Sequence, residues 1–309
     1  MTCFDDLTID VLPKIFDYLT FIELYQTFFG LQKRLDNIIR DNSTCIILSG
    51  IDLQSFQIKY SQLNLDKLRS ITLRKMNLLT LHSFIEKLPM KQFESITIGR
   101  FSWHYYPKDL YEQVWSIFMN SICPDRLRYL NLPYHIRYWN IQKLSFDFLN
   151  LEYAKLEYIS VNQMLLFMNH TPNLRRFQAC LDAPHKNLFC YTIILLQLKY
   201  LTLNLHDEWS FEQVQQLLNI CPHLKHLILK LEAQKDKKIM FEPSTWQKLI
   251  EEKLSHLKSL RLQLNCIVTD SNENIHNYQK SFNHAVYWQQ RQPHFQVTIY
   301  RILRTNSIL

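Results

Sequence analysis

Residue types that bind metal ions are grouped between Cys221 and His226. A thiolate and imidazole nitrogens are zinc ligands, and Cys221, His223 and His226 lie close together in the sequence. The segment joins a helical pattern to an extended one, which predicts that Cys221 points inward and that His223 is exposed. No fourth ligand follows at a spacing typical of zinc sites. We therefore predict that these side chains do not converge and that the chain has no metal site.

Catalytic chemistry has no support among the other reactive residues. The seven cysteines lie in no local signature of a nucleophile, and a catalytic thiol needs a base within hydrogen-bond reach. Only three glycines are present, Gly30, Gly50 and Gly99, whereas phosphate-binding loops need clustered glycines for close backbone approach. The sequence predicts a protein that is not an enzyme, with no catalytic residue and no cofactor.

Two segments combine tryptophan, tyrosine and arginine, the residue types that dominate the energetics of protein interfaces. Each segment directly follows an extended motif, so both loops are expected at the same edge of a sheet. We predict that they form part of a substrate-binding surface. The alternative is that the rings fill the longer turns of the fold, since an aromatic ring buries a large area wherever it lies. The candidate residues are Trp103, Tyr105, Tyr106, Arg137, Tyr138 and Trp139.

The extended motif that would position these loops recurs eight times. It consists of an apolar residue, two variable residues, an apolar residue, one variable residue and a third apolar residue. The last two apolar residues point to one side of an extended chain and the residue between them points to the other. This predicts strands with one buried face and one solvent face. The matches are Leu68/Ile71/Leu73, Phe93/Ile96/Ile98, Leu127/Leu130/Leu132, Leu156/Ile159/Val161, Leu174/Phe177/Ala179, Leu198/Leu201/Leu203, Leu224/Leu227/Leu229 and Leu257/Leu260/Leu262, and the intervening residues expected to face solvent are Thr72, Thr97, Asn131, Ser160, Gln178, Thr202, Ile228 and Arg261.

Segments with helical periodicity separate the strands, and two of them begin with capping-box sequences, Ser210-x-x-Gln213 and Ser244-x-x-Gln247. A strand, a turn, a helix and a return make one coil of a solenoid. No coil buries its apolar face alone, so neighbouring coils must stack. The alternating segment Phe295–Ile302 is expected to close the array as an edge strand. The alternative is an ordinary α/β domain with buried parallel strands, which also contains leucine-rich runs.

The returns from helix to strand carry a second recurring feature. Three of them contain a proline that ends the helix and favours extended structure before it. These are Cys123-Pro124, Thr171-Pro172 and Cys221-Pro222. Together with the strand motifs, the returns resemble the leucine-rich repeats of F-box proteins. The resemblance implies an α/β, horseshoe-like leucine-rich-repeat solenoid in which the residue before each proline caps the turn.

The first 42 residues are expected to form a separate helical unit. Asp10 as N-cap and Pro13 in the first turn predict a helix to about Leu19, and two more short helices follow within residues 22–39. Three such helices bury too little area to be stable alone, and their apolar side chains outnumber what one small core can hold. Some of these side chains must face another surface. The alternative is that the unit packs on the first repeat as an N-terminal cap.

The apolar positions of this unit resemble an F-box, with Phe4-x-x-Leu7, an acidic residue followed by leucine at Glu23-Leu24, and Leu31-x-x-Arg34-Leu35. The resemblance implies docking on the Skp-type adaptor of a cullin-RING ubiquitin ligase of the SCF type. The adaptor-binding residues that it implies are Leu7, Val11, Leu12, Ile15, Phe16, Leu19, Leu24 and Leu31.

Charge is distributed unevenly along the chain. Residues 1–50 carry a net charge of −3 and residues 51–309 carry +10, which favours two modules with different partners. We expect an F-box-like module at 1–42 and, at 43–309, a leucine-rich-repeat solenoid with a C-terminal capping segment.

Two functions from different classes are compatible with this organisation. The first is substrate recognition in an SCF-type ligase, in which the F-box binds the adaptor, and through it a cullin, while the repeats bind a target protein. The second is a repeat scaffold, independent of ubiquitin, that binds an acidic protein or nucleic acid through its positive charge. No compact nucleic-acid-binding motif is present, so a nucleic-acid partner is disfavoured.

The sequence also favours an intracellular location. The cysteines are scattered and odd in number, which is typical of reduced thiols. No signal segment is readable, and the longest apolar stretch, around Ile193–Leu196, is far shorter than the roughly 20 residues that cross a bilayer. We expect a cytoplasmic or nuclear protein without a membrane partner.

Overall fold

The structure is a computed structural model of the chain. It describes residues 45–49, 68–99, 107–132, 146–182, 194–206, 209–234, 238–268 and 275–303. The chain divides into two compact units, Met1–Pro133 and Tyr134–Leu309. The expected boundary at residue 42, and the F-box-like segment before it, lie outside the described residues.

The first unit contains parallel strands connected through helices. Its neighbouring strands pair in the order β1-β2-β3-β4, and each described pairing is parallel. Helices α5 and α6 pack against each other. The elements are β1 (Cys45–Ser49), β2 (Ser70–Arg74), α5 (Leu78–Lys87), the 3-10 helix η3 (Met90–Gln92), β3 (Ser95–Ile98), α6 (Lys108–Ser121) and β4 (Tyr129–Leu132).

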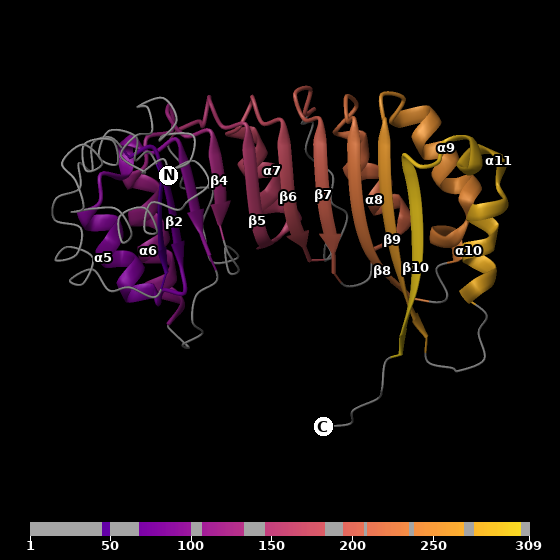
Figure 1. Ribbon diagram of the computed structural model, residues 1–309, viewed down its shortest axis with the longest axis horizontal. Helices are drawn as coiled ribbons and strands as arrows, with labels where there is room; N and C mark the ends of the chain where they lie inside the picture. Colours follow the sequence, from indigo (N-terminus) through magenta and orange to yellow (C-terminus); the bar gives the residue numbers. More distant parts are fainter. Residues whose placement is uncertain are drawn as a thin grey trace, which may run out of the picture. The chain divides into compact units, whose positions relative to one another are not determined.

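The second unit repeats the same plan with six strands in the order β5-β6-β7-β8-β9-β10, again all parallel. Helices α7 and α8 lie behind the strands in the view of Figure 1. The elements are β5 (Tyr153–Ile159), α7 (Val161–Asn169), β6 (Arg176–Leu181), β7 (Tyr200–Leu205), α8 (Phe211–Asn219), β8 (His226–Gln234), the 3-10 helix η6 (Lys238–Phe241), α9 (Pro243–Lys253), β9 (Ser259–Val268), α10 (Ile275–His284), α11 (Val286–Gln290) and β10 (Phe295–Leu303). The expected α/β architecture of parallel strands alternating with helices is confirmed.

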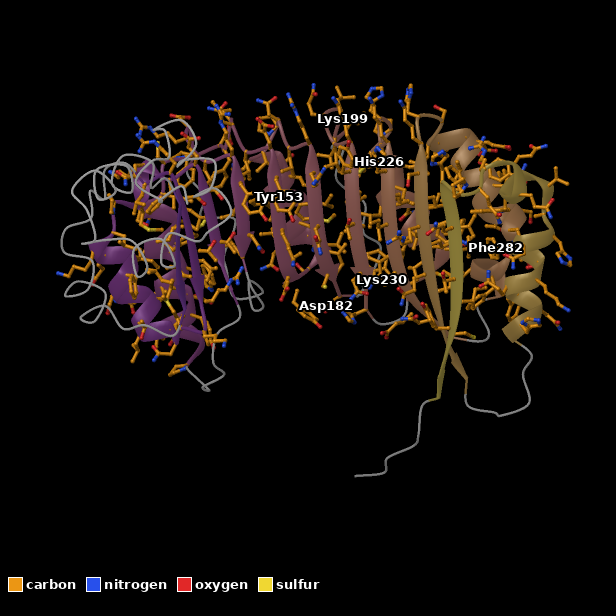
Figure 2. The ribbon with its side chains drawn as sticks, in the orientation of Figure 1. Tyr153, Asp182, Lys199, His226, Lys230 and Phe282 are labelled. Atoms are coloured by element: carbon orange, nitrogen blue, oxygen red, sulfur yellow. The ribbon has the colours of Figure 1, made fainter. Side chains whose placement is uncertain are left out.

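The strands of the second unit pair in register, so equivalent residues form continuous rows. One row of buried side chains runs through Phe177, Leu201, Leu227, Leu260 and Phe295, each at most 4% exposed. Burial of such a side chain contributes roughly 1.5–3 kcal/mol, and these rows form the core between the strands and the helices. The alternate residues point the other way, as predicted for Gln178, Thr202, Ile228 and Arg261, none of which is buried. Figure 2 shows Tyr153, His226 and Lys230 among the side chains of this second face.

The fourth strand match was wrong by five residues. Ser160 does not lie in a strand facing solvent but caps helix α7, whose first residue is Val161. The residues that pair with Phe177 and Ala179 are Ala154 and Leu156, so the motif begins at Leu151. The spacings on either side of it then become 24 and 23 residues instead of 29 and 18, and the array is more regular than the sequence analysis suggested.

Two of three serine-containing motifs form helix N-caps. The Ser210 hydroxyl accepts from the amide of Gln213, whose side chain in turn accepts from the Ser210 amide, which confirms the predicted capping box. Ser160 and Gln163 form another capping box that the sequence analysis missed. The prediction for Ser244 was wrong, because the N-cap of helix α9 is Glu242, two residues earlier, and it makes no side-chain cap bond; the helix begins at Pro243. Proline fits the first turn, where its missing amide hydrogen costs little.

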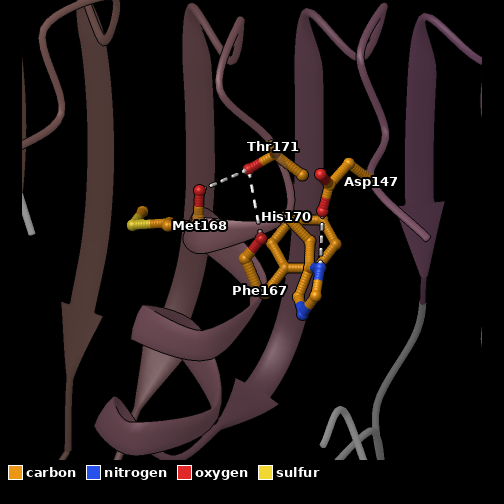
Figure 3. Close-up of polar contacts among 5 residues, drawn as sticks. All are labelled: Asp147, Phe167, Met168, His170 and Thr171. Carbon is orange, nitrogen blue, oxygen red and sulfur yellow. Dashed lines mark hydrogen bonds and ion pairs between the residues drawn. The ribbon is translucent and has the colours of Figure 1, made fainter. Parts of the chain in front are cut away.

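The return after α7 shows how one coil is attached to the next (Figure 3). Thr171 is 1% exposed, and its hydroxyl donates to the carbonyls of Phe167 and Met168 at 3.2 and 3.3 Å. These carbonyls belong to the last turn of the helix and also accept from the backbone amides of His170 and Thr171, so the hydroxyl adds a further bond to each. His170 Nδ1 lies 2.8 Å from a carboxylate oxygen of Asp147 in the preceding return. The expectation that Thr171 caps this turn is confirmed.

The last strand is protected along its outer edge by a helix. Strand β10 pairs with β9, as predicted for a strand that closes the array. On its other side, the side-chain amide of Gln279 in α10 donates to Val297 O at 3.0 Å and accepts from Ile299 N at 3.0 Å. The glutamine therefore makes two hydrogen bonds that a further strand would otherwise make, which protects the edge strand from pairing with another chain.

Two further observations concern the described residues. None of the helices among them is long and apolar enough to cross a membrane. Of the cysteines among them, Cys123, Cys180 and Cys221 form no disulfide bond.

The two serine motifs give a matched test of the fold. Ser210→Ala removes a cap and is expected to lower the free energy of unfolding by about 0.5–2 kcal/mol. Ser244→Ala removes no cap and should change it by less than about 0.5 kcal/mol. Urea unfolding of the two full-length variants, followed by circular dichroism, measures both values. Equal losses in the two variants would contradict the assignment of the caps.

Candidate binding surface on the open face of the strands

The open face is defined as the side of strands β5–β10 that carries Gln178, Thr202 and Arg261, opposite the buried rows. Because the strands are parallel and in register, each repeat position appears on this face as a row that crosses the strands. Adjacent strands lie about 4.8 Å apart, so side chains in one row are close enough to touch. The composition of each row therefore decides what the surface can bind.

The row nearest the N-terminal ends of the strands is an aromatic and cationic stack. Arg176 on β6 pairs in register with Tyr200 on β7, which pairs with His226 on β8. The guanidinium carbon of Arg176 lies 4.6 Å from the centre of the Tyr200 ring. The rings of Tyr200 and His226 are parallel within 2°, with centroids 4.5 Å apart. The stack fixes three side chains that would otherwise be mobile on an exposed face.

His226 is surrounded by positive charge. Burial lowers the pKa of its imidazole below the ordinary value of 6.5, and the nearby cations Lys258, Lys225 and Arg176 lower it further. At neutral pH the ring is therefore uncharged, which suits its stacking against Tyr200. The positive charge at this end of the open face therefore acts in the same direction as burial and disfavours the imidazolium form.

A second cluster lies toward the C-terminal ends of the strands. Tyr158 takes a left-handed backbone conformation with φ of 52° and stacks on His206 with ring centroids 5.2 Å apart. His206 Nε2 lies 3.1 Å from the amide nitrogen of Asn204, and His206 Nδ1 lies 4.0 Å from a carboxylate oxygen of Glu232. With the ring proton on Nδ1, beside Glu232, Nε2 accepts from Asn204. Asn204 also donates to the sulfur of Cys180 at 3.7 Å.

This cluster has the residue types of a thiol enzyme but not its electrostatics. The pKa of Cys180 is raised, chiefly by burial, so the thiolate that would act as nucleophile is disfavoured at neutral pH. Asn204 bonds both Cys180 and His206, so the cluster joins thiol to imidazole through an amide that cannot remove a proton. The arrangement is suited to holding strands β6 and β7 together and to offering polar groups to a ligand.

The predicted site residues are not among those that the structure describes. The adaptor-binding set Leu7, Val11, Leu12, Ile15, Phe16, Leu19, Leu24 and Leu31 lies outside the described residues, as does the substrate-binding set Trp103, Tyr105, Tyr106, Arg137, Tyr138 and Trp139. Both sets stay predictions.

The stack of Arg176, Tyr200 and His226 was missed by the sequence analysis, although a signal for it was present. Only the residue between the last two apolar positions of each motif was considered as a solvent-facing residue. The second variable residue, directly before the middle apolar position, faces the same side of the strand because it is two residues earlier. Tyr153, Arg176, Tyr200, His226 and Ser259 occupy this position and form one row.

The fold does not bring together the side chains of Cys221, His223 and His226. Cys221 is buried, and burial raises the pKa of its thiol to about 12, while His223 is exposed. His226 faces its stacking partner Tyr200 instead. Among the residues that the structure describes, no three His, Cys, Asp or Glu side chains are grouped so that they could hold a metal ion.

Comparison with known proteins adds no assignment to this surface: no protein-family model matches the chain, and neither does any curated protein.

The charge around His226 can be tested directly. Replacing Lys225 and Lys258 by glutamine is expected to raise the pKa of His226, because two cations that disfavour the imidazolium form are removed. The pKa should stay below 6.5, because burial, the largest cause of the shift, is unchanged. Titration of the ring protons by NMR, assigned with His226→Gln, measures the pKa.

The same shift has a consequence for stability with a definite sign. The folded-state pKa of His226 lies below the unfolded value, so on acidification below pH 6.5 the unfolded chain takes up a proton that the folded chain rejects. Stability is therefore lost as the pH falls, and His226→Gln should remove that part of the loss. An unchanged pKa in the lysine variant, or no effect of His226→Gln on the pH profile, would contradict this account of the site.

Proposed function

We propose that the chain is the substrate-recognition subunit of an SCF-type ubiquitin ligase. In this proposal its α/β coils are leucine-rich repeats of a solenoid, its F-box-like segment holds a Skp-type adaptor, and the open face holds a target protein. The chain then needs no reactive group of its own. It brings the target close to a ubiquitin-conjugating enzyme elsewhere in the complex, and proximity alone accelerates the transfer.

The observation that carries the recognition half of this proposal is the open face of strands β5–β10. Six parallel strands present rows of tyrosine, arginine, histidine and amide side chains to solvent. Tyrosine and arginine dominate interface energetics because they combine large contact area with polar groups. The thiol on this face, Cys180, has a raised pKa, which disfavours the nucleophilic thiolate. The surface is chemically suited to binding rather than to catalysis.

The adaptor half of the proposal is supported by the sequence. The apolar pattern from Phe4 to Leu35 resembles an F-box, and its charge of opposite sign to that of the repeats favours a separate partner. A short segment predicted to be helical, with more apolar side chains than its own core can hold, must bury some of them against another surface, and in this proposal that surface is the adaptor.

Adaptor binding is tested by replacing apolar residues of the first predicted helix. The double variant Ile15→Asp, Leu19→Asp is expected to lose capture of a Skp-type adaptor, because two buried apolar contacts are exchanged for charges that must be desolvated. The control is Lys14→Asp, which changes the net charge by the same amount at a polar position of the same segment. Pull-down with full-length chains measures capture, and circular dichroism verifies that the repeats stay folded.

Two outcomes would count against the adaptor half. If the double variant retains the adaptor, the F-box-like segment is not the docking element. If neither the wild-type chain nor the control captures an adaptor, the ubiquitin-independent repeat scaffold becomes the better account of the chain.

A further inference from the structure

A row of basic side chains lies at the N-terminal ends of four neighbouring strands. The basic row is defined as Arg175, Lys199, Lys225 and Lys258, the residues directly before the stack row on β6, β7, β8 and β9. Their backbones are adjacent: Lys199 N donates to Arg175 O at 2.9 Å, Lys225 N to Lys199 O at 2.9 Å, and Lys258 N to Lys225 O at 2.8 Å. Figure 2 shows Lys199 at this upper edge with His226 next to it. Three strand spacings of about 4.8 Å give the row a length of roughly 14 Å.

The basic row has little compensating charge. Its ion pair among the described residues is between Arg175 and Glu152, at 3.6 Å with both side chains about half exposed. Lys199, Lys225 and Lys258 form none with the described residues. Glu152 continues the row before β5 and pairs with Arg175, whereas Glu232 lies toward the other ends of the strands. From Lys225 to Glu232 the strand rises by roughly 23 Å, which is more than two Debye lengths of about 8–10 Å at physiological salt.

Like charges in neighbouring strands repel one another and oppose folding. The pKa of His226 is lowered first by burial and then by Lys258, Lys225 and Arg176, so these cations lie close enough to act on one side chain of the stack. A ligand with a complementary line of negative charge would relieve the repulsion. We infer that the basic row, with the adjoining stack of Arg176, Tyr200 and His226, binds an extended protein segment rich in aspartate and glutamate. This inference rests on the proposed function only in that the ligand is a protein.

The geometry favours a run of carboxylates over a single phosphate. Recognition of one phosphate group needs donors that converge on a point, usually from arginine. The basic row instead spreads its charges evenly along a line, one per strand, and most of them are lysines that act as separate point charges. An extended peptide advances by about 3.3 Å per residue, so roughly five residues of such a segment would span the row.

The stack argues against nucleic acid as the ligand. Proteins that bind single strands use aromatic rings as platforms on which bases stack. Tyr200 lies in register between Arg176 and His226, so one face of its ring is covered by a guanidinium and the other by an imidazole. No face of this ring is open to a base. Carboxylates, in contrast, need only the exposed cations and the polar edges of the stack.

The experiment measures binding of a fluorescently labelled glutamate-rich peptide to the full-length chain by anisotropy, with the corresponding glutamine-rich peptide as control. The test variant replaces Lys199, Lys225 and Lys258 by glutamine. The matched control variant replaces Lys248, Lys253 and Lys280, exposed lysines of α9 and α10 outside the open face, and loses the same three positive charges. Thermal unfolding of both variants verifies that they are folded.

The glutamate-rich peptide is expected to bind more tightly than the glutamine-rich peptide and to bind more weakly as salt is added. The test variant should weaken this binding about tenfold, since each exposed pair contributes modestly and three are removed. The control variant should leave it unchanged. Since no adaptor is present in the assay, failure of adaptor capture does not affect the result.

Three results would overturn the inference. One is absence of peptide binding by the wild-type chain, and another is equal weakening by both variants, which would reflect net charge alone. The third is tighter binding of a single-stranded oligonucleotide, or of a neutral peptide with one phosphoserine, lost in the test variant, since either would assign the basic row to another ligand.

Discussion

The in-register parallel pairing of the strands is the constraint on which the described structure depends. A single coil has an apolar strand face and an apolar helix face, and neither is buried until the next coil stacks on it. Stacking in register aligns Phe177, Leu201, Leu227, Leu260 and Phe295 into one buried row. The same pairing aligns the remaining positions of the repeat into rows as well. A residue type that recurs at the position before each strand therefore appears on neighbouring strands at intervals of about 4.8 Å. The register that packs the core thus also sets the pattern of side chains on the surface.

The fold class could be predicted from the sequence because the strand motif is local and recurs, whereas the register of one coil could not. Leu156, Ile159 and Val161 have the spacing of the motif, yet they belong to the end of strand β5 and the start of helix α7. All three are buried, so apolar spacing alone cannot separate them from a strand. The pairing of Ala154 with Phe177 identifies the true motif, and alanine is a weak hydrophobic signal. The capping box at Ser160 is a local signal that marks the start of helix α7. The same signal at Ser244 predicts the wrong N-cap, because Pro243 already begins helix α9 and the N-cap is Glu242, two residues earlier.

The composition of the open face was present in the sequence, but its arrangement depends on long-range pairing. Arg175, Lys199, Lys225 and Lys258 occupy one repeat position, which could have been seen once the motifs were aligned. The stack of Arg176, Tyr200 and His226 could not have been found by composition, because its members are separated by more than twenty residues and meet only through the strand register. The segments at 101–106 and 134–139, in which aromatic binding residues were predicted, lie outside the described residues. The predicted and the observed candidate surfaces are therefore different sets of residues.

The two clusters on the open face differ in whether their charged groups have partners, and this difference is relevant to function. Toward the C-terminal ends of the strands, Glu232 lies beside His206, and Asn204 bonds both His206 and Cys180, so polar groups satisfy one another. At the N-terminal ends, Lys199, Lys225 and Lys258 form no ion pair with the described residues. Burial lowers the pKa of His226, and Lys258, Lys225 and Arg176 lower it further. Packing gives no reason to place like charges side by side, since exposed polar residues of any kind would suffice there. The repulsion among these lysines does not help the chain to fold, and a ligand of opposite charge gives a reason for it. On this argument the N-terminal edge of the strands, rather than the cysteine and histidine cluster at the other edge, is the part of the surface that selects the partner.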